Sequence, residues 1–238
     1  MKTLASRDEE ISLLEQQIRE HAHPGQVLQI LEAGAGREWP LNMDGVAYEL
    51  TGIDMDAKAL EARRDIQKDL HHVIVGDLRT ATLPDGSYDV IYSSYVLEHI
   101  ENAGLVLENF ARWLRPGGLI IIRVPDRDSV HGFMTRVTPF QAHVLYKRHV
   151  MGRKFAGTPG HGPYETIYDR SVSRAGIAEF CASHGLTLRD EWGHGTYVRG
   201  QGLWKKIIPV FARSVDMLSF GRLHADFLNL TYIIEKPT

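Results

Sequence analysis

The sequence predicts an α/β fold in which helices cover both faces of a mostly parallel, doubly wound sheet. The first observation is the stretch 28–36, where a short aliphatic run ends in Glu32 and passes directly into a glycine-spaced turn. Such a run is typical of a buried parallel strand. The second observation is that further aliphatic runs recur with helical patterns between them, as expected for a parallel sheet.

Composition and charge limit the class of protein. The chain has 238 residues, of which 43% are hydrophobic and 24% charged, and its formal net charge is −3. These values suit one globular domain over residues 1–238, with a cap insert at about 127–170. No apolar run is long enough to cross a bilayer, and the first ten residues lack the apolar core of a signal peptide, so we expect a cytoplasmic location. Cys181 is the only cysteine, which excludes an intramolecular disulfide.

The glycine-spaced turn is a candidate ligand site. Gly34 and Gly36 carry no Cβ, so a ligand can lie against the backbone there. Glu32 stands at the carboxyl end of the expected strand, where open α/β sheets bind their ligands. A carboxylate at this place suits an ammonium or hydroxyl group better than a phosphate. The alternative interpretation is a tight strand-to-helix turn that binds nothing.

The next expected strand, 49–54, ends in a second carboxylate. Asp54 follows Gly34 by 20 residues, the interval at which an acidic residue binds the ribose hydroxyls of a nucleoside. A dinucleotide site would need a third glycine three residues after Gly36, but Trp39 occupies that position. The pattern therefore favours an adenosine ligand without a diphosphate, of which S-adenosylmethionine is the common example.

Six short motifs in order carry a resemblance to a family. They lie at 32–36, 52–54, 76–78, 83–89, 93–99 and 114–118. In this order and spacing they resemble the class I S-adenosylmethionine-dependent methyltransferases, in particular the group that acts on small molecules. The resemblance implies S-adenosylmethionine as the cofactor. It also implies a Rossmann-like seven-stranded sheet, whose last strand lies antiparallel between the fifth and the sixth, with a substrate-capping insert after the fifth strand.

The resemblance assigns roles to residues at the ends of the strands. Asp77 would accept a hydrogen bond from the adenine amino group, and Leu78 would pack on the ring. Ser94 and Tyr95 would touch the methionine end of the cofactor, whereas His99 would shape the site. The residues expected to bind the cofactor are Glu32, Gly34, Gly36, Asp54, Met55, Asp77, Leu78, Ser94, Tyr95 and His99.

The remaining elements follow from periodicity and capping signals. Ile11, Leu14 and Ile18 fall at helical spacing, which predicts a helix over residues 8–22. Ser173 can cap a helix that Gly185 ends. The other expected helix covers 57–69, and the other expected strands cover 71–76, 88–93, 119–124, 186–191 and 227–235.

The segment after the fifth strand is expected to select the substrate. Residues 129–164 contain no Asp or Glu but several Lys, Arg and His. Thr138 and Pro139 can begin a helix there and Gly152 can end it, before a turn-rich stretch that could act as a lid. A basic, aromatic insert favours an anionic substrate, for which we expect contacts from Arg136, His161 and Tyr164. A solvated basic face and a helix on a membrane surface are the alternatives, the latter not favoured.

Methyl transfer also needs a group that removes a proton from the acceptor. Histidine suits this role near neutral pH, and His131, which closely follows the fifth strand, is the expected base. His143, His149, His161 and His194 are further candidates. We therefore expect methyl transfer to an O or N atom of a small molecule that has an anionic or aromatic part, without a metal ion.

Other functions remain open on the sequence. A nicotinamide-dependent oxidoreductase is disfavoured by Trp39. A non-catalytic S-adenosylmethionine-binding module and a methyltransferase for a lipid or lipid-linked glycan at a membrane surface are further alternatives. Nucleic acid is not an expected partner, because residues 93–96 lack the Asn/Asp-Pro-Pro-Tyr/Phe box of amino-methylating nucleic-acid enzymes. The sequence predicts neither the acceptor nor the oligomeric state.

Overall fold

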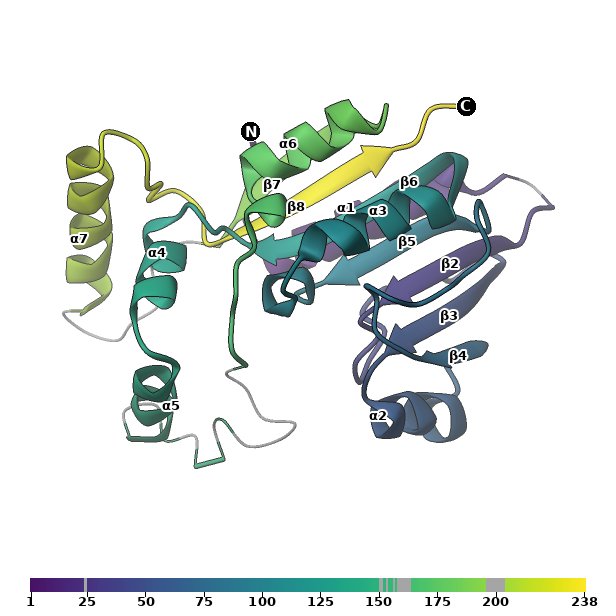
Figure 1. Cartoon of the computed structure of the whole chain (residues 1–238), viewed down its shortest axis with the longest axis horizontal. Helices are drawn as coiled ribbons and strands as arrows, with labels where there is room; N and C mark the ends of the chain where they lie inside the picture. Colours follow the sequence, from purple (N-terminus) through teal and green to yellow (C-terminus); the bar gives the residue numbers. More distant parts are fainter. Residues whose placement is uncertain (24, 150–151, 153, 156, 158–163, 196–203) are drawn as a thin grey trace.

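A computed structural model shows the chain as one open sheet with helices packed around it (Figure 1). It describes all residues except 24, 150–151, 153, 156, 158–163 and 196–203. The sheet has eight strands in the order β1-β7-β8-β6-β5-β2-β3-β4. Strand β8 is antiparallel to its neighbours β6 and β7, and the other pairings are parallel.

The strands are β1 (Lys2–Leu4), β2 (Leu28–Ala33), β3 (Tyr48–Asp54), β4 (His72–Val75), β5 (Tyr88–Ser94), β6 (Leu114–Pro125), β7 (Thr187–His194) and β8 (Asn229–Glu235). The α-helices are α1 (Arg7–His21), α2 (Ala57–Ala62), α3 (Ala103–Trp113), α4 (Val130–Val137), α5 (Phe140–His149), α6 (Arg174–Ser183) and α7 (Trp204–Leu218). Three short helices complete the described elements: the π-helix η1 (Arg63–Gln67) and the 3-10 helices η2 (Leu97–His99) and η3 (Arg170–Val172).

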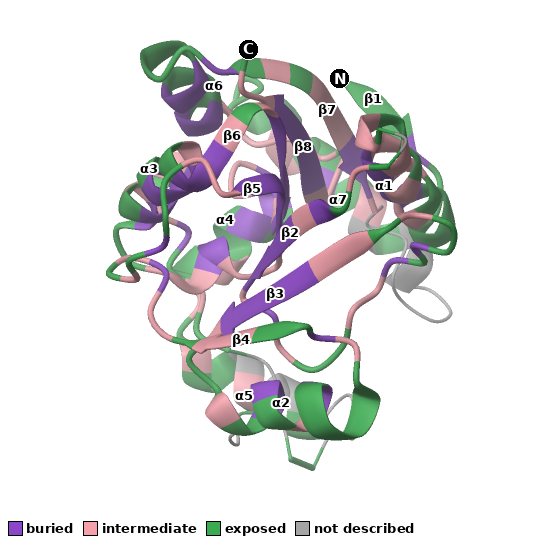
Figure 2. Cartoon of the chain, turned by 90° about the vertical axis from the view of Figure 1, so that its right-hand side faces the viewer, coloured by how far each residue is buried: buried purple, intermediate pink, exposed green. Residues whose placement is uncertain are grey.

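The core lies on both faces of the sheet because successive strand residues point to opposite sides. Ile120 and Ile122 of β6 pack in the cluster that includes Phe110 of α3 and Phe180 of α6. Ile121, between them, packs on the other face. The side chains that α1 and α2 contribute to that second face are Leu14, Ile18 and Leu60. Both faces of the central strands are therefore buried, as their colouring in Figure 2 shows.

The predicted fold class is confirmed, including the antiparallel strand between the fifth and sixth strands of the expected sheet. Several elements differ from expectation, among them helices α4 and α7, which the sequence analysis did not predict. A further edge strand, β1, pairs in parallel with β7. The helix expected over 57–69 is α2 followed by η1, and the sixth strand continues to His194. The Ser173 cap is present, because its Oγ accepts a hydrogen bond from the Gly176 N–H at 3.1 Å.

The strand order places a crevice at one edge of the sheet. From β2 the chain proceeds outward to β3 and β4, and then returns to the other side of β2 as β5. This reversal between β2 and β5 is a topological switch point, where the loops after neighbouring strands diverge and leave room for a ligand. The residues expected to bind the cofactor follow the carboxyl ends of β2, β3, β4 and β5, so the topology brings them to this one edge.

Candidate functional site

The glycine loop after β2 allows neighbouring atoms to lie close to its backbone. Gly34 has a φ of +78°, and a Cβ at this position would lie 2.2 Å from Val96 Cγ2, so only glycine fits. The Gly34 N–H donates to the Ile53 carbonyl at 2.8 Å, which ties the loop to β3. The loop is thus held flat between the ends of β3 and β5, with its backbone bordering a cavity.

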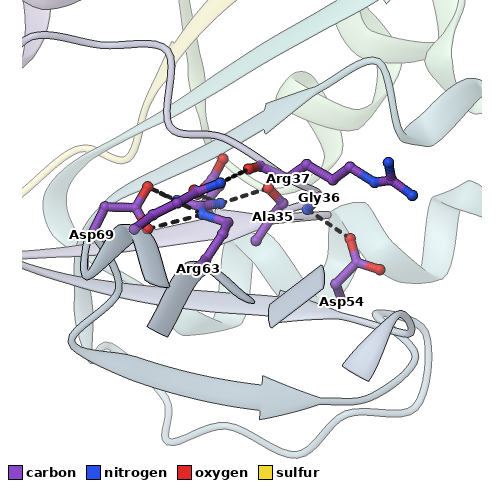
Figure 3. Close-up of polar contacts among 8 residues, drawn as sticks. Ala35, Gly36, Arg37, Asp54, Arg63 and Asp69 are labelled. Atoms are coloured by element: carbon purple, nitrogen blue, oxygen red, sulfur yellow. Dashed lines mark hydrogen bonds and ion pairs between the residues drawn. The ribbon is translucent and has the colours of Figure 1, made fainter. Parts of the chain in front are cut away.

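Asp54, at the end of β3, supports this loop directly. One carboxylate oxygen accepts a hydrogen bond from the Gly36 N–H at 2.9 Å, and Figure 3 shows the side chain turned toward that amide. The other oxygen accepts from the Asp56 N–H at 2.8 Å. Each carboxylate oxygen has a further lone pair that can accept a hydrogen bond from a hydroxyl group. Asp54 can therefore bind the two hydroxyl groups of a diol while it holds the glycine loop in place.

The first cavity, which we call the β3 cavity, has a volume of about 860 Å³. It lies over the ends of β3, β4 and β5. Carboxylates at one end and apolar side chains along the wall suit a polar group attached to a flat ring. Of the predicted cofactor residues, those that line it are Gly34, Gly36, Asp54, Met55, Asp77, Leu78, Ser94, Tyr95 and His99.

Asp77 in this cavity is already paired. Arg79 Nη2 lies 2.6 Å from its Oδ2, and the Arg79 N–H donates to its Oδ1 at 2.9 Å. The hydrogen bonds from the Arg79 side chain, followed by that from its backbone, lower the pKa of Asp77 below its usual value. Asp77 is therefore an ionised acceptor, which suits the amino group expected to bind there.

The second cavity, the β7 cavity, has a volume of about 720 Å³ and extends from the glycine loop to β7. It shares Gly34, Gly36, Arg37, Ser94 and Tyr95 with the β3 cavity, so the two meet at the end of β5. Its far wall comes from the start of α1 and the end of β7. A ligand that spans both cavities would thus pass between the glycine loop and Tyr95.

A buried ionic cluster forms the floor of the β7 cavity. Glu10 of α1 accepts hydrogen bonds from the guanidinium of Arg123 and the hydroxyl of Thr231, and His194 Nε2 lies 2.9 Å from Glu10 Oε1. Burial alone would raise the pKa of Glu10. The hydrogen bonds from His194 and Arg123, together with the charge of Arg123, outweigh this effect and lower the pKa to about 2. The carboxylate is therefore ionised inside the protein.

Arg123 connects this floor to the residues after β5. Its Nη1 donates to the Tyr92 hydroxyl at 3.1 Å and to Ser94 Oγ at 3.0 Å. Its guanidinium also lies 5.0 Å from the centre of the Tyr95 ring. Tyr95 has a φ of +56°, an uncommon conformation for a residue with a side chain. The contact with Arg123 and the hydrogen bond from the Tyr95 N–H to the Arg123 carbonyl hold this strained residue at the junction of the cavities.

Glu32 lies in the wall of the β7 cavity, but its carboxylate forms an ion pair with an arginine of the protein. Arg63 Nη1 lies 2.6 Å from Glu32 Oε2 and donates to the Ala35 carbonyl at the same distance. The guanidinium also contacts Asp69, and Figure 3 shows Arg63 between Asp69 and the Ala35 end of the glycine loop. Glu32 therefore faces an arginine of η1, where the sequence led us to expect an ammonium or hydroxyl group of a ligand.

His99 lies at the rim of the β3 cavity. Its Nδ1 is 2.6 Å from the Glu165 carbonyl, so a protonated Nδ1 donates there, and its ring packs edge-on against Tyr164 at 5.8 Å. Burial lowers the pKa of His99, which favours the neutral imidazole. Tyr164, predicted to contact the substrate, thus lines the β3 cavity beside His99.

Two of the other predicted catalytic and substrate residues lie apart from the cavities. His131 and Arg136 are on α4, are exposed, and line neither cavity. His161 falls outside the described residues. These three assignments stay predictions. Within the described residues, no group of three or more His, Cys, Asp or Glu side chains could hold a metal ion, and no helix has the length and apolar character needed to cross a membrane.

The sequence interpretation missed several cavity residues. Glu10 was interpreted only as a polar position of an amphipathic helix. Arg123 is the one charged residue in an aliphatic run, and this pattern indicates a buried ion pair, because a buried arginine requires a partner. Arg37 follows the second glycine of the loop and lines both cavities. Arg7 and Asn229 also line the β7 cavity, from elements far apart in the sequence.

Comparisons with known proteins agree with this architecture. A family model described as a methyltransferase domain matches residues 31–122. The chain is 30% identical over 163 residues to a probable S-adenosylmethionine-dependent methyltransferase of Mycolicibacterium smegmatis, covering 67% of this chain and 61% of that protein. It is 32% identical over 101 residues to a malonyl-acyl-carrier-protein O-methyltransferase of Serratia marcescens, covering 42% of this chain and 38% of that protein.

A solved structure extends the likeness over most of the fold. The S-adenosylmethionine-dependent methyltransferase of Mesorhizobium loti matches with a TM-score of 0.55 and 15% identity, covering 92% of this chain and 96% of that one. At this identity the match supports the fold alone. The chain spans less than two thirds of the length of the two sequence relatives described above.

Proposed function

Because the chain belongs to the class I S-adenosylmethionine-dependent methyltransferases, we propose that it transfers a methyl group from S-adenosylmethionine to an O or N atom of a small molecule with an anionic or aromatic part. The observation that carries this proposal is the meeting of two cavities at the end of β5. Both are lined by carboxylates and guanidinium groups. The β3 cavity adds apolar side chains, whereas the β7 cavity adds aromatic rings, and its Glu10 is paired with Arg123.

The residues of the β3 cavity fit the cofactor of the family. Asp54 has lone pairs for ribose hydroxyls, Asp77 is an ionised acceptor for an amino group, and Leu78 and Met55 supply apolar surface for a purine. Ser94 and Tyr95 border the passage into the β7 cavity, where the methionine end would lie. When bound, S-adenosylmethionine supplies an activated methyl group, so the task of the protein is to bring the acceptor into line with it.

The β7 cavity fits an acceptor with an anionic part. Arg7 and Arg37 line it, and neither guanidinium pairs with a carboxylate in the part of the chain that the structure describes. Arginine binds carboxylates and phosphates through two parallel hydrogen bonds. The Tyr92 and Tyr95 rings add aromatic surface. The Serratia marcescens relative is named for O-methylation of a malonyl group, which contains a carboxylate, and this agrees with an anionic acceptor.

An acceptor that presents a hydroxyl or ammonium group must also lose a proton during the transfer. His131, predicted from the sequence, is one candidate. His99 and His194 line the cavities, and His194 Nε2 lies 2.9 Å from the buried carboxylate of Glu10. A histidine held by a buried carboxylate is a common arrangement for a general base. We therefore propose His194 as the alternative to His131.

Calorimetric titration with S-adenosylhomocysteine tests the cofactor site first. We expect micromolar binding, about 8 kcal/mol, and a loss of at least about 1.5 kcal/mol in Asp54→Ala, because the variant loses a charged hydrogen-bond acceptor and a support of the glycine loop. Asp65→Ala is the matched control, because Asp65 is an exposed carboxylate that lines neither cavity. Absence of heat in a folded, ligand-free sample would overturn the proposal. Binding would justify a search for the acceptor with labelled methyl donor.

A second candidate function is methyl transfer to a lipid or lipid-linked glycan at a membrane surface. The observation that favours it is the apolar surface that α4 and α7 leave exposed beyond the carboxyl end of β6. This candidate would place the same cavities next to a bilayer, and the same cofactor site would serve it. Labelled methyl recovered in the lipid fraction of an extract would distinguish it from transfer to a water-soluble acceptor.

A further inference from the structure

Helix α7 turns an apolar stripe toward solvent. Its large apolar side chains recur at intervals of three and four residues, so they form one face of the helix. That face is exposed, whereas Ala212 on the other side is buried. An amphipathic helix of a globular protein normally buries its apolar face. The exposed members of the stripe are Ile207, Val210, Phe211, Met217 and Leu218.

Helix α4 lies beside α7 and also exposes apolar side chains. The two helices pack against each other, and Figure 1 shows both beyond the carboxyl end of β6. Exposed apolar side chains of α4, and one that lies two residues after the end of α7, add to the area. These added side chains are Phe133, Met134, Val137 and Phe220. Together with the stripe of α7 they form what we call the α4–α7 surface.

Helices α4 and α7 together carry a net positive charge. Their cations are Arg136, Lys205, Lys206 and Arg213, and their one acid is Asp216. Arg136 on α4 and Arg213 on α7 are exposed there. Asp216 is partly exposed and accepts a hydrogen bond from the Ala225 N–H at 3.3 Å. Apolar side chains bordered by cations are the combination that binds an anionic lipid surface.

We propose that the α4–α7 surface docks on a membrane that contains anionic lipids, with the apolar stripe in the interfacial region and the arginines at the phosphate groups. Lipid headgroups complement the charge, and the interfacial region accommodates several protruding aliphatic and aromatic side chains on two helices. Docking would bring the carboxyl edge of the sheet, where the cavities lie, toward the bilayer. The docking proposal depends neither on methyl transfer nor on cofactor binding.

Co-sedimentation with vesicles tests this inference without any activity assay. The probes are vesicles of phosphatidylcholine alone and vesicles of phosphatidylcholine and phosphatidylglycerol in equal parts. We expect the full chain to bind the anionic vesicles at least about tenfold more tightly, and to bind less tightly as the salt concentration rises above about 0.1 M, where exposed charges are screened. Failure to bind either vesicle would overturn the proposal.

Two double variants test whether the α4–α7 surface is the part of the protein that contacts the vesicle. The side chains replaced in the two variants are similarly exposed. Phe211→Ser with Leu218→Ser removes side chains of α7 that are 53% and 78% exposed. Leu105→Ser with Ile66→Ser removes side chains that are 47% and 79% exposed outside this surface. We expect the first pair to weaken vesicle binding at least about tenfold and the second pair to leave it unchanged. Equal effects of the two pairs would contradict the assignment.

Two further measurements distinguish a membrane from the two other partners that could cover this surface, a second copy of the chain and an acidic protein. Light scattering on the wild type and on the α7 variant reports a second copy: a dimer that the variant dissociates, with no vesicle binding, would replace the membrane by a partner subunit. Titration with polyglutamate reports an acidic protein. Tight binding to polyglutamate, with no binding to anionic vesicles, would overturn the membrane assignment in favour of such a partner.

Discussion

Arg63 and Glu32 form a buried ion pair beneath the glycine loop, with Nη1 of the arginine 2.6 Å from Oε2 of the glutamate. The Arg63 side chain is fully buried, and it also donates to the Ala35 carbonyl in the loop. The pair therefore joins η1 to the end of β2 and to the loop that borders both cavities. It fixes the position of the loop from the side opposite Asp54.

Replacement of Arg63 should destabilise the protein strongly. Arg63→Met keeps much of the side-chain volume but leaves the Glu32 carboxylate buried without its cation. Breaking one partner of a buried pair costs about 3–5 kcal/mol. Urea denaturation monitored by tryptophan fluorescence measures the change in the free energy of unfolding. Arg64→Met is the control, because Arg64 forms an exposed pair with Asp65, and its midpoint should stay close to that of the wild type. Equal midpoints for the two variants would contradict this account.

The strand ends were predictable from the sequence because local pattern and site coincide there. Gly34, Asp54 and Asp77 each follow an aliphatic run directly, and parallel strands bring their carboxyl ends to one edge. Their positions needed only the identification of each strand. The structure accordingly places all three in the wall of the β3 cavity.

The buried ionic groups were not predictable because their partners come from distant elements. Glu10, Arg123 and His194 lie in α1, β6 and β7, which meet only once the sheet has formed. An arginine inside an aliphatic strand indicates that a partner exists but not which carboxylate it is. Likewise, helical periodicity over 57–69 could not predict η1, the segment in which Arg63 stands.

Glu98 should make the protein less stable as the pH rises. Its Oε2 has no hydrogen-bond partner among the described side chains and backbone, and burial raises its pKa to about 8. Between the ordinary pKa of 4.5 and about 8 the folded state therefore keeps a proton that the unfolded state releases, so stability falls with pH in this window. The limiting slope for one proton is about 1.4 kcal/mol per pH unit. Burial raises the pKa of Glu32 to about 8 as well, so Glu98→Gln should reduce the fall of the urea midpoint between pH 5 and pH 8 without abolishing it. An unchanged slope would refute the assignment.

Glu10 should have the opposite dependence, at lower pH. Its pKa is lowered from 4.5 to about 2, because the hydrogen bonds from His194 and Arg123 outweigh the cost of burial. The unfolded state therefore binds a proton first, and the stabilisation is present above about pH 4.5 and lost as the pH falls toward 2. Urea midpoints of the wild type and Glu10→Gln, measured from pH 6 downward, should converge as the medium becomes acidic. Parallel curves would show that Glu10 does not contribute in this way.

Two histidine variants decide between the candidate bases once a methyl acceptor is known. His194 lines the β7 cavity and its Nε2 lies 2.9 Å from Glu10 Oε1, whereas His131 is exposed and lines neither cavity. His194→Asn should lower kcat about 10²- to 10⁴-fold. His131→Asn should leave kcat nearly unchanged. Unchanged binding of S-adenosylhomocysteine shows that each variant is folded. If His131→Asn loses the rate and His194→Asn keeps it, the base is the histidine of α4 and the cap reaches the acceptor during turnover.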